Sequence, residues 1–176
     1  MSKLTTKDLT SIAVMTALTA VCSLITVPFT VPFTMQTFAV FFSLRFLGGK
    51  NGCISIALYI LLGAVGLPVF SGFSGGLGHL AGPTGGYIAG FLLSGVIYCL
   101  GERQADKGRL LRYTLQAVCL LACYLCGTFW FCHVTGLGFI AAASVCVLPF
   151  VIPDAVKISL ANLVSDRLNH QIRSKS

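Results

Sequence analysis

The stretch Phe150-Val-Ile-Pro-Asp-Ala-Val-Lys-Ile-Ser-Leu-Ala-Asn162 places two charges, Asp154 and Lys157, inside a long apolar segment. At the centre of a bilayer, each such charge costs roughly 2.5–3.5 kcal/mol on insertion scales. On a helix, residues three apart share a face, so these two opposite charges can partly neutralise each other. The pair predicts either a structural ion pair that fixes helix packing or a binding site for a small polar molecule. The rest of the chain favours the binding site.

The composition is that of an integral membrane protein. Of the 176 residues, 56% are hydrophobic and 10% charged, and the mean hydropathy is +0.89. Soluble domains carry about 25% charged residues. Because one membrane helix needs about 20 residues, the chain has room for six spans and no soluble domain. We therefore expect an all-α protein with one six-helix transmembrane domain over residues 1–176.

Hydropathy and breaker residues place the six expected membrane helices at residues 8–27, 35–47, 51–67, 84–100, 113–134 and 139–166. Pro149 and Pro153 should kink or break the last helix just before the two charges. A broken helix in a membrane is tolerated where its backbone is buried in protein or lines a cavity.

The basic residues indicate the orientation of these helices. Of the twelve Lys and Arg residues, all except Lys157 lie at the two termini or in the second-to-third and fourth-to-fifth connections. The positive-inside rule makes that side, with both termini, cytoplasmic. The net charge of +7 therefore reflects membrane orientation, and no nucleic-acid partner is expected.

A long uncharged loop over residues 66–86 combines eight glycines with aromatic and aliphatic side chains. Such a loop can fold tightly and approach a ligand with its backbone, as lids and binding loops do. It lacks the lysine and hydroxyl residue of a phosphate-binding loop. His79 within it is expected to be a hydrogen-bonded loop residue rather than a metal ligand.

Two further patterns leave alternatives open. Ala13 and Ala17 begin a small-residue stripe that permits close helix contact, either within this chain or with another membrane subunit. The eight cysteines lie in or beside apolar segments, where Cys packs as a small hydrophobe. A metal or redox site at Cys119, Cys123 and Cys126 is disfavoured because no second ligand cluster completes it. No metal or cofactor is expected.

Four motifs in this order resemble those of the BioY family, the biotin-specific substrate-binding (S) components of energy-coupling factor (ECF) transporters. They are Val31-Pro-Phe-Thr-Met-Gln-Thr37, Gly66-Leu-Pro-Val-Phe-Ser-Gly-Phe73, Gly82-Pro-Thr-Gly-Gly-Tyr87 and Pro153-Asp-Ala-Val-Lys157. The resemblance implies a six-helix S-component fold in the cell membrane that binds biotin near its outer face. It also implies a partner module made of a transmembrane coupling subunit and two ATPases, with Ala13 and Ala17 at the docking stripe.

The predicted binding residues follow from the chemistry of biotin, which carries a carboxylate and a ureido group. Lys157 can supply a cation for the carboxylate and Asp154 an acceptor for the ureido N–H groups, and the reverse assignment is also open. Phe73 and Tyr87 are expected to pack against the bicyclic ring and the valeryl chain. The remaining polar candidates are Thr34, Gln36 and Asn162.

Three other functions compete with biotin uptake. The chain can be an S component for a different vitamin, or a structural membrane subunit that binds no ligand. It can also be a small intramembrane enzyme with Asp154 as general base and Lys157 tuning it. The absence of a nucleophile, metal set or cofactor motif beside the pair argues against an enzyme. The sequence has no ATP-binding motif, so concentrative transport requires a partner or another gradient.

Overall fold

The computed structural model describes residues 4–28 and 31–175, with side chains up to residue 171. Its elements, in chain order, are α1 (Thr6–Leu24), β1 (Thr26–Val27), β2 (Phe33–Thr34), α2 (Gln36–Leu47), α3 (Gly49–Ala64), α4 (Leu77–Ala81), α5 (Gly85–Ala105), α6 (Arg109–Thr135), α7 (Phe139–Cys146) and α8 (Leu148–Lys175).

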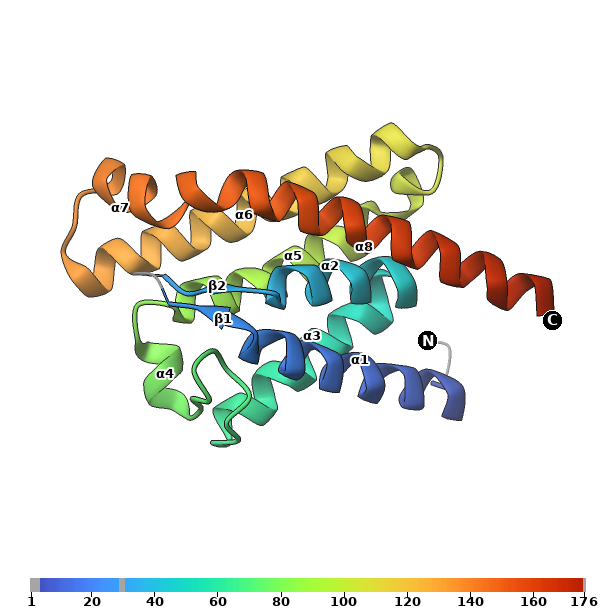
Figure 1. The fold of residues 1–176 in the computed structure, drawn as a ribbon, viewed down its shortest axis with the longest axis horizontal. Helices are drawn as coiled ribbons and strands as arrows, with labels where there is room; N and C mark the ends of the chain where they lie inside the picture. The colour runs from blue at the N-terminus through green and yellow to red at the C-terminus, as the bar shows by residue number, and fades with distance from the viewer. Residues whose placement is uncertain (1–3, 29–30, 176) are drawn as a thin grey trace.

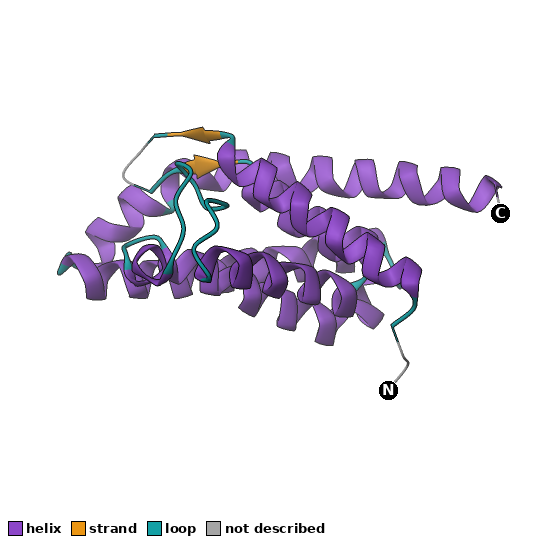
Figure 2. Cartoon of the chain, turned by 90° about the horizontal axis from the view of Figure 1, so that it is seen from below, coloured by secondary structure: helices purple, strands orange, loops and turns teal. Residues whose placement is uncertain are grey.

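The helices form an elongated bundle with two different ends (Figure 1). The start of α1 and the end of α8 lie at one end, while the β1–β2 hairpin, α4 and α7 gather at the other. Figure 2 shows the hairpin and the long loop together at this second end. The two ends of the described chain therefore lie at the same end of the bundle.

The first helix begins with a capping box and ends earlier than predicted. The Thr5 backbone N–H donates to the Asp8 carboxylate over 2.9 Å, and the Asp8 N–H donates to the Thr5 hydroxyl over 3.3 Å, which satisfies two free backbone donors of the first turn. The prediction that this helix runs to residue 27 is wrong, because Thr26 and Val27 leave it to pair with Thr34 and Phe33. Residues 29 and 30 of the predicted loop lie outside the described residues.

Within the described residues, four helices are long and apolar enough to span a membrane, namely α1, α5, α6 and α8. The helices α2 and α3 are apolar but shorter, with 12 and 16 residues. Each of the six predicted segments overlaps helical structure, with different boundaries. The segment predicted as a loop over residues 66–86 also contains the short helix α4.

The last predicted segment is divided into α7 and α8 rather than continuous to residue 166. The division falls at Val147, whose backbone is non-helical with φ −122° and ψ −55°. Pro149 lies in the first turn of α8, where a missing N–H costs no helical hydrogen bond. Pro153 stays inside α8. The predicted break therefore exists, but it precedes both prolines.

Glycines allow α5 and α6 to pack closely. A Cβ atom at Gly86 would lie 2.2 Å from the Cβ of Trp130, and one at Gly90 would lie 3.0 Å from the Cα of Cys123. Larger side chains would therefore force the two helices apart. This contact brings the start of α5 and the C-terminal half of α6 together to form one wall of the cavity described below.

Candidate functional site

A cavity lies at the hairpin end of the bundle, between α2, α5, α6 and α8 and beneath the long loop. Its volume is about 70 Å³, which is below the range of roughly 300–1,000 Å³ typical of small-molecule sites. Entry of a ligand larger than a few atoms therefore requires the lining side chains to move.

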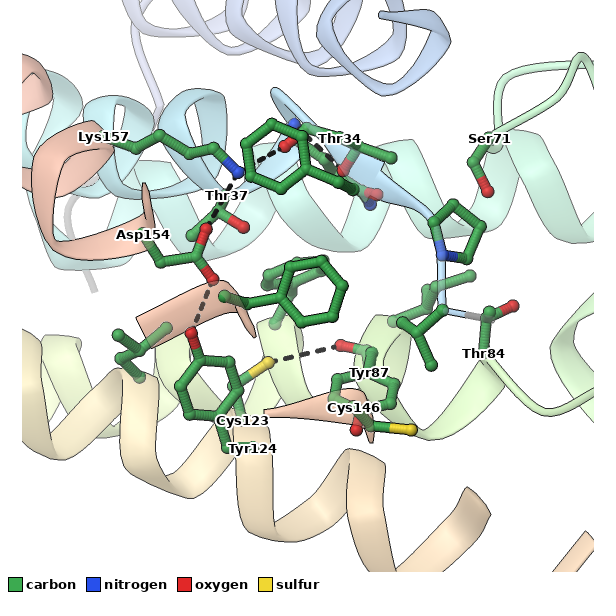
Figure 3. A pocket seen from close by; sticks show the side chains of 18 of the residues that line it. Thr34, Thr37, Ser71, Thr84, Tyr87, Cys123, Tyr124, Cys146, Asp154 and Lys157 are labelled. Atoms are coloured by element: carbon green, nitrogen blue, oxygen red, sulfur yellow. Dashed lines mark hydrogen bonds and ion pairs between the residues drawn. The ribbon is translucent and has the colours of Figure 1, made fainter. Parts of the chain in front are cut away.

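The charged side of the cavity is formed by the two residues that the sequence singled out. Asp154 and Lys157 are each only 5% exposed, and the Lys157 Nζ lies 2.8 Å from the Asp154 Oδ1. The two charges therefore form an ion pair, which is compatible with both alternatives drawn from the sequence. The ammonium group also donates to the Thr34 carbonyl over 2.6 Å and lies 3.7 Å from the centroid of the Phe33 ring. The short hairpin thus provides two further stabilising contacts for the cation (Figure 3).

The second carboxylate oxygen of Asp154 accepts a hydrogen bond from Tyr124 on α6. The Tyr124 hydroxyl lies 2.7 Å from the Asp154 Oδ2, the length of a charge-assisted bond. Buried charges persist only when they are paired and hydrogen-bonded. Tyr124 therefore completes the set of partners around the Asp154 carboxylate in its apolar surrounding.

The walls of the cavity are apolar and aromatic. The Phe33 and Phe150 rings stack with centroids 6.0 Å apart and an interplanar angle of 9°. Tyr87 reaches the cavity from α5 because Gly127 leaves space for it, since a Cβ there would lie 2.2 Å from the Tyr87 ring. Such surfaces suit a ligand with a large apolar part and few polar groups.

Opposite the charged pair, the cavity is lined by polar but uncharged groups of the loop and the start of α5 (Figure 3). Ser71 and Thr84 contribute hydroxyls. The two ring nitrogens of His79 lie 2.9 Å from the Ser74 Oγ and 3.3 Å from the Thr84 Oγ1, which confirms the prediction of a hydrogen-bonded histidine. Burial lowers the pKa of His79 below its ordinary value of 6.5.

The structure brings five of the seven predicted binding residues to the cavity. They are Thr34, Gln36, Tyr87, Asp154 and Lys157. Gln36 also donates to the Tyr59 hydroxyl over 3.1 Å. Phe73 lies outside the cavity lining and is 71% exposed. Asn162 is also outside the lining and pairs with Gln116 on α6.

Several lining residues were missed by the sequence reasoning. Tyr124, with a hydroxyl in an apolar helix, carried a signal, because a buried tyrosine hydroxyl normally finds a hydrogen-bond partner. The sequence does not single out the other lining residues, because aromatic and hydroxyl side chains are common in membrane helices and loops. These residues are Phe33, Ser71, Thr84 and Phe150. Among the described residues, no group of three or more His, Cys, Asp or Glu side chains is placed to hold a metal ion.

Comparison with known proteins gives consistent matches over nearly the whole chain. The model of the BioY family matches residues 1–174. The chain is 42% identical to a probable biotin transporter BioY of Pyrococcus horikoshii, over 92% of this chain and 96% of the relative. It is 39% identical to the biotin transporter BioY of Thermotoga maritima, over 92% and 95% of the two chains.

The fold also matches a solved structure. The crystal structure of the S-component for biotin from an ECF-type ABC transporter superposes with a TM-score of 0.85, covering 96% of this chain and 95% of that chain, at 24% identity. At this level of identity, the match supports the fold.

Proposed function

This chain belongs to the BioY family, and we propose from that premise that it captures biotin in the membrane for uptake into the cell. It is a transporter component that binds substrate, as its relatives are named biotin transporters. The observation that carries the proposal is the buried Asp154–Lys157 pair, which lines a cavity with aromatic walls. Biotin has matching chemistry, with a polar bicyclic head, an aliphatic chain and a carboxylate.

Both charges act on one end of the ligand in this proposal. Because the Lys157 Nζ and the Asp154 Oδ1 are only 2.8 Å apart, they cannot reach the two ends of an extended biotin molecule. A ureido group presents a carbonyl acceptor and N–H donors side by side, so it can accept from Lys157 and donate to Asp154 at once. The carboxylate then faces the hydroxyls of Ser71 and Thr84 on the opposite side. Contacts of biotin with Phe73 and Asn162 stay predictions.

Biotin titration of the purified protein in detergent tests the proposal. We expect one-to-one binding that Lys157→Ala and Asp154→Asn each weaken by more than about tenfold, or 1.4 kcal/mol. Ser159→Ala is a matched control on the same helix, because Ser159 is exposed and bonds only within α8. Unchanged affinity in both charge variants would make the pair structural, and no binding by the wild type would remove the biotin assignment.

A comparison of biotin with its neutral carboxamide tests the ligand orientation. If Lys157 binds the ureido group, Lys157→Ala should weaken both ligands by the same factor. If Lys157 binds the carboxylate, the substitution should weaken biotin much more than the carboxamide. The second outcome would reverse the orientation without affecting the function itself.

We further propose six spans with both termini cytoplasmic and a coupling partner of the ECF type. The common end of α1 and α8 and the distribution of basic residues support this orientation. Ala13 and Ala17 are exposed on α1, so they are available for contact with another membrane helix. Ala13→Leu should then reduce biotin uptake in cells that contain the coupling subunit while leaving biotin affinity unchanged. Loss of affinity would instead indicate a role within this chain.

A further inference from the structure

The helices α6 and α8 run antiparallel (Figure 1) and are joined by three polar contacts at matching intervals. Tyr124 contacts Asp154, Gln116 contacts Asn162, and Arg112 contacts Asp166. The first two contacts are separated by eight residues on each helix and the last two by four. We call these three contacts the polar seam. Because the spacing is equal on both helices, the three contacts stay in register along about 18 Å of helix, at 1.5 Å per residue.

The central contact is buried, as is the Tyr124–Asp154 contact, whereas the Arg112–Asp166 contact is exposed. Gln116 is fully buried and Asn162 is 3% exposed. Each amide donates to the other, over 3.0 Å from Gln116 to Asn162 and 2.7 Å in return. A buried amide without a partner is strongly unfavourable in an apolar surrounding. Sliding or rotating α8 by one residue, which turns a side chain by about 100°, would break both bonds.

The cavity end of α8 packs against α2, is tied to the hairpin by the Lys157–Thr34 hydrogen bond and the Phe33–Phe150 stack, and meets α6 through the polar seam. The chain is non-helical at Val147, immediately before α8 begins. Pro153 has no N–H, so the carbonyl four residues earlier lacks its usual helical donor. Helical hydrogen bonding is therefore weakened on the α7 side of Asp154, and the buried amide pair ties the following part of α8 to α6.

We propose that Gln116 and Asn162 are positioning residues that set the register of α8 against α6 and thereby hold the Asp154 carboxylate at the ligand. This inference rests on the proposed function, because the quantity it explains is biotin affinity. Neither residue lines the cavity, so both act through Asp154 rather than by contact with biotin. It also gives Asn162 a role different from the direct contact predicted from the sequence.

Exchange of the two amides tests this inference. Gln116→Asn and Asn162→Gln should each weaken biotin binding by about three- to tenfold, the range expected for one interhelical hydrogen bond in a membrane protein. The double variant Q116N/N162Q restores the combined length of the pair and should return the Kd to within about threefold of wild type. Thermal unfolding of every variant is measured in parallel.

The Asp154→Asn background separates positioning from general stability. If the amides act through Asp154, Gln116→Asn should weaken binding less than about twofold once that charge is gone. Ile158→Val is the matched control, since Ile158 is a buried apolar residue between the amide pair and Asp154 on the same helix. It should lower the unfolding temperature and leave the Kd within about twofold.

Three results would overturn the inference. They are an equal loss of affinity from Gln116→Asn in both backgrounds, no recovery in the exchanged variant, or a change in unfolding temperature without a change in Kd. If Gln116→Asn does not fold, Asn162→Gln provides the same comparison. Absence of biotin binding by the wild type would refute the proposed function and this inference together, whereas the three results above leave the function standing.

Discussion

Neutralising both charges of the buried pair, Asp154→Asn with Lys157→Met, separates its role in stability from its role in binding. At 2.8 Å, two unit charges attract by about 6 kcal/mol at an effective dielectric constant near 20. Burial of the two side chains offsets most of that attraction, so the intact pair contributes little net stability. Removing one partner is different, because it leaves the other charge buried and uncompensated, at about 3–5 kcal/mol.

Each single variant should therefore be less stable than the double variant. The Lys157→Met change also loses the contact with the Phe33 ring, a desolvated cation–π interaction of about 2 kcal/mol. In the double variant, the introduced asparagine can still accept from the Tyr124 hydroxyl, and the introduced methionine fills the space of the lysine stem. At roughly 2–4 °C per kcal/mol for a chain of this length, each single variant should unfold at least about 6 °C below wild type. The double variant also lacks the contact with the Phe33 ring, so it should unfold between the single variants and wild type.

Biotin binding should not follow stability in this series. The double variant presents neither a cation nor a charged acceptor, so its affinity should stay at least about 100-fold below wild type, or 2.7 kcal/mol. Thermal unfolding and biotin titration on the same preparations provide the two measurements. Recovery of biotin affinity in the double variant would refute the reasoning, because it would show that the pair only stabilises the helix.

Three further predictions concern the loop that covers the cavity. Gly63→Ala should destabilise the protein by about 1–3 kcal/mol in thermal unfolding, because the new Cβ would lie 2.0 Å from the buried Phe70 ring. Gly78→Ala is the control, because a Cβ there meets nothing within 4 Å and the change should be neutral. Burial lowers the pKa of His79, so the unfolded state binds more protons than the folded state near and below pH 6.5. The free energy of unfolding should therefore fall as the pH decreases from 7.5 to 5.5. His79→Gln should flatten that dependence, and an unchanged slope would contradict this assignment. Trp130, the single tryptophan, donates to the Gly82 carbonyl over 2.9 Å. Biotin should therefore change its fluorescence in wild type, and in Lys157→Ala only at biotin concentrations higher by about tenfold or more.

The sequence predicted the helices and the charged pair because both produce strong local signals. Long apolar runs leave few alternatives to a membrane helix, and charges such as Asp154 and Lys157 are costly in lipid without a partner. The helix boundaries were less accurate. The first helix was predicted to reach residue 27 because the short hairpin depends on pairing with Phe33 and Thr34, a tertiary contact with little local pattern. The helix break was predicted at Pro149 and Pro153 because proline is the strongest local breaker in the sequence, whereas the structure has the break at Val147.

The partners of the polar residues could not be read from spacing along one helix. Asn162 lies one turn beyond Lys157, which made it a candidate ligand, and only its distance to Gln116 on α6 shows that its hydrogen bonds are already made. Tyr124 shows the converse, since its hydroxyl meets Asp154 from a helix that had no assigned role. A polar residue in a membrane helix therefore predicts that a partner exists, and the packing of a second helix determines which partner it is. That packing determines which polar residues line the cavity and which pair with each other outside it.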